Sequence, residues 1–169
     1  VAFAVSGRLF VGDMHNAREV VINTTAPGTI YDARISPDGK QVAYVRGSAL
    51  FVCDMQGSER CLTPETASDV LWGVAEFVAA EEMNRQRGYW WSPNSDALVV
   101  ERVDNSPIEL ITIADPSQPT VAPQTRRYPF AGTNNARTSL HVINLEARST
   151  DIVWDAEAFE YLTSVQWNK

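Results

Sequence analysis

Residues 30–63, IYDARISPDGKQVAYVRGSALFVCDMQGSERCLT, carry the most regular pattern in the chain. Apolar and polar residues alternate on both sides of the tetrapeptide SPDG at 36–39, which is typical of β-strands. In that tetrapeptide the proline presets φ, and the aspartate and glycine favour the bend and the left-handed residue of a tight hairpin. We therefore predict strands at 31–35, 42–45 and 50–52, connected by short turns.

Two features of this stretch recur elsewhere in the chain. A similar turn, SPNS, stands at 92–95, and LFVGDM at 9–14 repeats LFVCDM at 50–55. A further copy begins at 165–168. Repeats of about four short strands are typical of propeller blades, which stack because one small sheet cannot bury both of its faces alone. The expected fold class is all-β: a partial β-propeller of about three blades of four-stranded antiparallel sheets, with a short inserted helix.

Two segments interrupt the strand pattern. Residues 74–87 contain mostly good helix formers and no glycine or proline, which predicts the inserted helix. Residues 114–123 contain three prolines, which indicates a loop. Residues 161–167 again have the pattern of a strand. The predicted division is a partial blade at 1–27, a blade at 28–66, a blade at 67–160 that holds both interruptions, and the start of a next blade at 161–169.

Trp90 and Trp91 follow Tyr89 in a strand-like run. Successive strand residues point to opposite faces, so we expect the two tryptophans to enter two different apolar faces. Their large area favours the core over a peptide-binding surface.

Composition and charge exclude several classes of protein. The 169 residues are 44% hydrophobic and 21% charged, the balance of an ordinary globular domain. The net charge of -7 and the pI near 4.8 argue against nucleic acid as a partner, because its phosphates would repel such a surface. No apolar run reaches the roughly 18 residues of a membrane-spanning helix, so we expect no membrane segment.

The first residues already resemble a strand and contain no signal-peptide pattern. We therefore expect a segment of a longer protein. Its compartment stays open, with the cytoplasm slightly favoured over the periplasm or the cell surface.

Cofactor and metal signatures are missing from the sequence. It has no clustered zinc ligands, no calcium loop and no glycine-rich phosphate loop, so we predict no cofactor and no metal. Cys53 and Cys61 flank a predicted hairpin turn at 54–60. They are compatible with a cross-strand disulfide or with two reduced thiols.

Catalytic signatures are equally scarce. The chain contains no G-x-S-x-G segment that would present a nucleophilic serine. His15 follows a strand in a polar turn, and His141 lies inside the strand expected at 139–144. Without a nucleophile beside it, each is expected to be an ordinary histidine rather than a catalytic base. We predict no catalytic residue in this chain.

Glu81 and Glu82 remain as candidate binding residues. Adjacent carboxylates on a helix point about 100° apart, yet at the edge of a helix both can converge on one α-ammonium group. On the pattern alone, two neighbouring glutamates on a mostly polar helix are more often a solvated face.

Four blocks of sequence change this weighting: GVAEFVAAEEM at 73–83, GYWWSP at 88–93, RVDNSP at 102–107 and YPFAGTN at 128–134, with Arg85 between the first two. In content, order and spacing they resemble the propeller of bacterial dipeptidyl peptidase IV-like enzymes, within the prolyl oligopeptidase superfamily. The resemblance covers most of the chain from residue 30 onward.

The resemblance implies a propeller that caps an α/β-hydrolase domain of the same parent chain, with a peptide substrate held between them. It implies that Glu81 and Glu82 bind the free N-terminus of that peptide, so that a serine peptidase releases X-Pro or X-Ala dipeptides. The catalytic serine, aspartate and histidine would belong to the hydrolase domain, so this chain alone is expected to be inactive. Exposed blade edges would allow a homodimer. The alternative is a non-catalytic propeller that serves as a protein-interaction scaffold, for instance in an inactive peptidase homologue.

Overall fold

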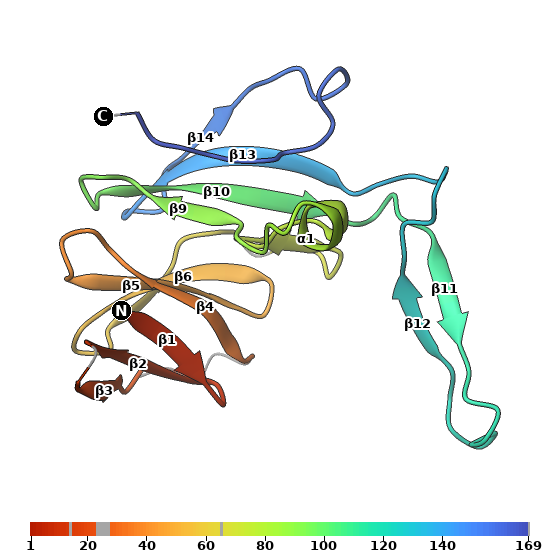
Figure 1. Cartoon of the computed structure of the whole chain (residues 1–169), viewed down its shortest axis with the longest axis horizontal. Helices are drawn as coiled ribbons and strands as arrows, with labels where there is room; N and C mark the ends of the chain where they lie inside the picture. The colour runs from red at the N-terminus through yellow and green to blue at the C-terminus, as the bar shows by residue number, and fades with distance from the viewer. Residues whose placement is uncertain (14, 23–27, 65, 169) are drawn as a thin grey trace.

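The computed structural model describes residues 1–13, 15–22, 28–64 and 66–168. Within them, three antiparallel sheets follow one another along the chain and stack, and a hairpin projects from the third (Figure 1). This arrangement agrees with the predicted all-β partial propeller. Met14 of the repeated segment, the predicted boundary at residue 27 and Lys169 lie outside the described residues.

Local hairpins build the first two sheets, because each strand pairs antiparallel with the next one along the chain. The first sheet consists of β1 (Ala2–Val5), β2 (Arg8–Gly12) and β3 (Ala17–Val20). The second consists of β4 (Ile30–Ile35), β5 (Gln41–Arg46), β6 (Ala49–Asp54) and β7 (Glu59–Cys61).

The SPDG turn connects β4 to β5, as predicted. Ser36 Oγ accepts a hydrogen bond from the first amide of β5 at 3.0 Å and donates one to Asp38 Oδ1 at 2.6 Å. Gly39 has a φ of +74°, which a residue with a Cβ rarely adopts. The related turn at 92–95 lies next to it in space, because the Asp38 amide donates to Ser95 Oγ at 3.0 Å.

The third sheet has an edge strand that is split in two. The sheet consists of β8 (Val70–Trp72), β9 (Tyr89–Trp91), β10 (Ala97–Asp104), β13 (Arg137–Asn144) and β14 (Ser149–Ile152). β8 pairs with residues 102–104 of β10, and β9 pairs with residues 98–100 of the same strand. Residues 73–88 therefore leave the sheet between two halves of one edge.

The projecting hairpin consists of β11 (Leu110–Ile113) and β12 (Gln124–Arg127), and residues 114–123 form the loop at its tip (Figure 1). Arg127 anchors its base, because the guanidinium donates two hydrogen bonds of 2.8 Å to the Asp69 carboxylate beside β8.

The neighbouring tryptophans enter two different apolar faces, which confirms the expectation from alternation. Tyr89 and Trp91 face the second sheet, where Tyr89 Oη donates to Ala43 O at 2.9 Å and Trp91 Nε1 donates to Arg34 O at 3.1 Å. Trp90 belongs to a separate cluster on the outer face of the third sheet.

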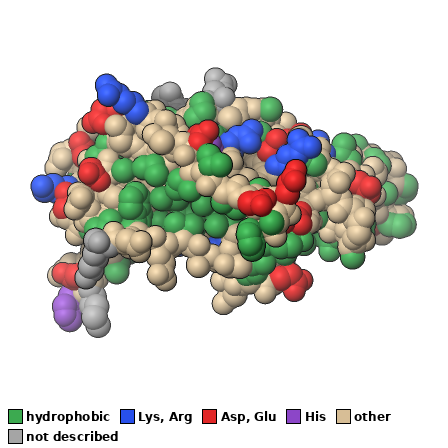
Figure 2. Space-filling view, turned by 90° about the horizontal axis from the view of Figure 1, so that it is seen from above, with side chains coloured by type: hydrophobic (Ala, Val, Ile, Leu, Met, Phe, Trp, Pro, Cys, Tyr) green, Lys and Arg blue, Asp and Glu red, His purple; other side chains and the backbone are tan. Residues whose placement is uncertain are grey.

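Residues 161–167 contain no strand, so that prediction was wrong. The segment crosses the outer face of the third sheet, where Trp167 Nε1 donates to Trp90 O at 3.2 Å. A strand needs a neighbour that completes its ladder of hydrogen bonds, and no described strand pairs with this segment. Figure 2 views the molecule from this side and shows hydrophobic side chains gathered over the middle of the face, with charged side chains scattered around them.

Both cysteines are free thiols. The register of β6 and β7 places Cys53 opposite Glu59 and Cys61 opposite Phe51, so the two sulfurs are offset along the strands. Of the two alternatives, the structure has the reduced pair. No helix in the described part of the chain is long and apolar enough to cross a membrane.

Candidate functional site

Glu81 and Glu82 lie on α1 (Phe77–Glu82), the helix inserted between β8 and β9. Both side chains are exposed. Among the described residues, neither glutamate forms an ion pair or accepts a side-chain hydrogen bond. The helix lies at the end of the third sheet from which the hairpin of β11 and β12 departs (Figure 1). The two carboxylates are therefore open to a cation that approaches this end of the sheet.

The inserted helix is shorter than the predicted 74–87. It begins after Glu76, whose carboxylate accepts hydrogen bonds of 2.6 and 2.5 Å from the backbone amides of Val78 and Ala79. Val74 and Arg87, near the two ends of the predicted helix, instead form an antiparallel bridge. Helix propensity did not reveal this pairing, because the bridge joins positions that are far apart on a helix.

Both stems of the insertion close onto a single residue of β10. The Gly73 amide donates to Glu101 O, and the Glu101 amide donates to Gly88 O, each at 2.8 Å. A Cβ at Gly88 would lie 2.3 Å from the backbone of Val74, so only glycine fits where the two stems cross. The insertion thus has a narrow, closed base.

A buried ion pair lies next to this base, because the side chain of the same Glu101 binds Arg85. The guanidinium of Arg85 donates to the Glu101 carboxylate through Nη1 at 2.5 Å and through Nη2 at 3.1 Å. The two side chains are 8% and 0% exposed, respectively. Arg85 also donates to Arg87 O at 2.8 Å and to Leu162 O at 3.0 Å. One side chain therefore connects the insertion, β10 and the C-terminal segment.

Burial raises the pKa of Glu101, and the hydrogen bonds and charge of Arg85 oppose that rise. The negative charge of Glu76 adds a smaller upward contribution to this pKa. Arg85 stands between two of the blocks that resemble the family but no role was predicted for it, and Glu101 was not predicted as a functional residue. A signal was present, because Glu101 is a charged residue within the mostly apolar run LVVERV at 98–103, and it is fully buried.

Three exposed aromatic side chains pack against one another at the start of α1. The rings of Phe77 and Tyr128 are 5.3 Å apart, and those of Tyr128 and Phe130 are 4.9 Å apart, both edge to face. Phe77 stands one helical turn before Glu81, so the two share a face of α1. The YPFAGTN block, which follows β12 in sequence, therefore packs against the start of the glutamate helix.

His141 lies between two side-chain partners that were not predicted. Its Nε2 is 2.9 Å from Ser139 Oγ, and its Nδ1 is 2.9 Å from Asp151 Oδ1. The signal was the two-residue spacing, which puts Ser139 and His141 on one face of β13. A hydrolytic serine also needs free N–H groups for the oxyanion, and Ser139 lies inside a strand opposite Arg102 rather than on a turn. We assign no catalysis to this group. His15 is exposed, just after β2.

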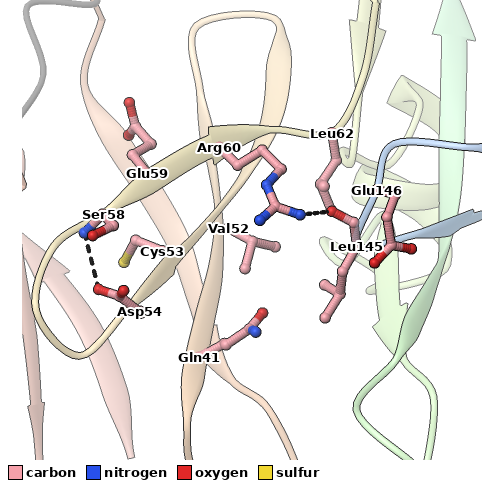
Figure 3. Close-up of a pocket in the computed structure, with 10 residues that line it drawn as sticks. All are labelled: Gln41, Val52, Cys53, Asp54, Ser58, Glu59, Arg60, Leu62, Leu145 and Glu146. Atoms are coloured by element: carbon pink, nitrogen blue, oxygen red, sulfur yellow. Dashed lines mark hydrogen bonds between the residues drawn. The ribbon is translucent and has the colours of Figure 1, made fainter.

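A cavity of about 370 Å³ lies between β6 and β7 of the second sheet and the turn that follows β13 (Figure 3). Arg60 reaches across it and donates to Leu145 O. The Cys53 thiol lines the cavity, and burial raises its pKa to about 12, which makes it a poor nucleophile at neutral pH. Neither Glu81 nor Glu82 lines this cavity. In the described ranges, no group of three or more His, Cys, Asp or Glu side chains could hold a metal ion.

Comparisons with known proteins point to one family. The family model described as "Dipeptidyl peptidase IV (DPP IV) N-terminal region" matches residues 3–169. Dipeptidyl peptidase 8 of Homo sapiens is 27% identical over 160 residues, which cover 80% of this chain and 18% of the human protein. Dipeptidyl peptidase 4 of Trichophyton tonsurans is 26% identical over 143 residues, which cover 80% of this chain and 18% of that protein.

A solved structure shares the fold. The crystal structure of Porphyromonas gingivalis dipeptidyl peptidase 4 superimposes with a TM-score of 0.70 at 23% sequence identity. The match covers 87% of this chain and 24% of that chain. The present chain thus spans less than a quarter of the length of each of these relatives.

Proposed function

This chain belongs to the family of dipeptidyl peptidase IV N-terminal regions, and on that premise we propose that it recognises the free N-terminus of a peptide substrate within a serine dipeptidyl peptidase. Glu81 and Glu82 bind the α-ammonium group of the substrate. The parent enzyme then releases X-Pro or X-Ala dipeptides from peptide N-termini.

One observation carries the proposal: two adjacent, exposed carboxylates stand on a short helix whose base is closed and buried. An α-ammonium has three N–H donors, and two carboxylates can accept two charge-assisted hydrogen bonds from it. An anion pair fixed at a set distance from a catalytic serine would select the bond after the second residue. It would also reject peptides whose N-terminus carries no charge.

The other parts of the reaction belong to the parent protein. We assign the catalytic serine, aspartate and histidine to an α/β-hydrolase domain of the same parent chain, which is the partner that this segment covers. The substrate lies between the two. The 169 residues alone should hydrolyse no peptide.

The test uses the full-length parent and a chromogenic dipeptidyl-proline substrate. Glu81→Gln and Glu82→Gln each remove one charge from the pair, and each should lower kcat/KM by about 10- to 100-fold, the loss expected for a hydrogen bond to a charged group. Glu146→Gln is the matched control, because Glu146 is exposed on the turn after β13. Unchanged kcat/KM in both Gln variants of the pair would reject the proposal.

A further inference from the structure

We propose that Arg85 and Glu101 are positioning residues that aim Glu81 and Glu82 at the substrate N-terminus. This inference rests on the proposed function, since it assigns the buried ion pair a task in the same binding event. Neither residue touches the substrate. Both act through the placement of α1.

The helix has little else to hold it in place. It is six residues long, and Ala79 is its one buried residue. An isolated helix of this length is unstable in water, and the burial of one small side chain fixes its direction only weakly. Apart from the solvent-exposed contact of Phe77 with Tyr128, the orientation of α1 therefore comes from its two flanks, the Glu76 cap before it and the segment around Arg85 after it.

Arg85 is placed to set this orientation. Its backbone amide donates to Ala79 O at 3.0 Å, which attaches it to the helix. Its guanidinium donates two hydrogen bonds, from Nη1 and Nη2, to the carboxylate of Glu101, and the backbone of Glu101 already holds both stems of the insertion through Gly73 and Gly88. A planar guanidinium with two bonds to one carboxylate has a fixed direction as well as a fixed position. The helix is thereby oriented relative to β10.

Stability alone does not explain a buried pair at this place. The desolvation of two charges offsets most of their attraction, so buried ion pairs are often replaceable by apolar residues without loss of stability. What an apolar pair could not reproduce is the set of directed bonds to Glu101, Arg87 O and Leu162 O. The bond to Leu162 O also ties the helix to the C-terminal segment that covers the third sheet.

The experiment compares three variants in the full-length parent. Arg85→Lys keeps the charge but cannot form the paired hydrogen bonds to the Glu101 carboxylate together with those to Arg87 O and Leu162 O. The double variant Arg85→Met with Glu101→Leu removes both charges, so that no unpaired ion stays buried and folding is retained. Arg46→Lys is the matched control, because Arg46 and Glu59 form a similarly buried pair in the second sheet, 4% and 7% exposed.

Each variant is assayed with two substrates, a dipeptidyl-proline substrate with a free α-amine and an analogue in which a hydroxyl replaces that amine. Arg85→Lys and the double variant should raise KM for the amine substrate by about tenfold or more, since misplacement by about an ångström weakens a fixed contact strongly. The kcat should change little, because the anchor binds the ground state and the transition state alike. The kcat/KM of these two variants for the hydroxyl analogue should equal that of the wild type. Arg46→Lys should leave kcat/KM unchanged for both substrates.

A second comparison separates positioning from general damage. When Glu81 and Glu82 are already Gln, adding Arg85→Lys should cause no further loss, because no anchor is left to misplace. Equal losses on both substrates, or a loss that multiplies with that of the Gln variants, would overturn the positioning role and leave the proposed function intact. Full activity of the Gln variants themselves would overturn the proposed function and this inference with it.

Discussion

Glu101 is a carboxylate with 0% exposure in the middle of an apolar strand, and it is the residue on which the candidate site is built. Its backbone pairs with both stems of the insertion, and its side chain binds Arg85. A buried carboxylate is costly unless its charge and its lone pairs are satisfied. A change at Glu101 should therefore alter both the free energy of unfolding and the placement of the insertion that carries Glu81 and Glu82.

The raised pKa of Glu101 predicts a pH dependence of stability. The group binds its proton more tightly in the folded state than at its usual pKa of 4.5. Its stabilising contribution is present below that value and is lost as pH rises through the folded-state pKa. In urea unfolding at a series of pH values, the free energy of unfolding of the wild type should fall relative to Glu101→Gln as pH rises above about 4.5.

Asp104 on the same strand provides a control of opposite sign. Hydrogen bonds from Ser106 lower the pKa of Asp104, so its contribution is present above its usual pKa and is lost as pH falls. The difference between wild type and Asp104→Asn should grow as pH rises. If the free energy of unfolding of the wild type also rose with pH relative to Glu101→Gln, the raised pKa of Glu101 would be contradicted.

The two cysteines should differ sharply in reactivity. Burial raises the pKa of Cys53 to about 12, so that very little of this thiol is ionised at pH 8, whereas Cys61 is exposed. A thiol-specific chromogenic reagent should titrate one thiol in the folded chain and two after denaturation. Two reactive thiols in the folded chain would contradict the burial of Cys53, and none in either state would indicate a disulfide.

At the scale of elements, α1 depends on its cap. Glu76 accepts hydrogen bonds from two amides at the start of the helix. Loss of an N-cap side chain typically costs about 1 kcal/mol, so Glu76→Ala should lower the free energy of unfolding by roughly that amount. Glu81→Ala, on the exposed side of the same helix, should change it by less than about 0.5 kcal/mol. Equal effects of the two variants in urea unfolding would show that the cap contributes nothing.

The sequence predicted those elements that depend only on residues near one another in the chain. The SPDG turn and its flanking strands follow from turn chemistry and alternation, and alternation also placed Trp90 and Trp91 on opposite faces. The rest depends on distant partners. Val74 and Arg87 shorten the helix by pairing with each other, and residues 161–167 lack the neighbour that would make them a strand.

The candidate site divides in the same way. Glu81 and Glu82 were named from resemblance to a family, and their role stays a prediction. Arg85 and Glu101 are 16 residues apart, one in an insertion and one in a strand, so no helical or strand spacing brings them together. Their contact exists because residues 73–88 fold back onto β10.

At the scale of the whole molecule, the outer face of the third sheet is apolar and incompletely covered (Figure 2). Val153 and Phe159 belong to the segment after β14, whose Trp154 and Leu162 pack against this face, and they are 90% and 70% exposed. Exposed apolar surface of this kind favours association. The 169-residue chain should therefore self-associate at micromolar concentrations, and sedimentation velocity over a range of concentrations measures this.

Charge substitutions locate the contact. Val153→Glu together with Phe159→Glu should shift the chain toward monomer, and Val121→Glu, on the exposed loop of the projecting hairpin, should leave the association unchanged. A chain that is monomeric throughout, or an association abolished by Val121→Glu alone, would contradict the role of the outer face.

The proposed task of the molecule is to hold two anions where a peptide's charged N-terminus must bind. A crystal structure of the full-length parent with a bound dipeptide product measures this directly. The α-ammonium nitrogen should lie about 2.7–2.9 Å from a carboxylate oxygen of Glu81 and from one of Glu82. An ammonium bound elsewhere, with both carboxylates facing solvent, would contradict the account.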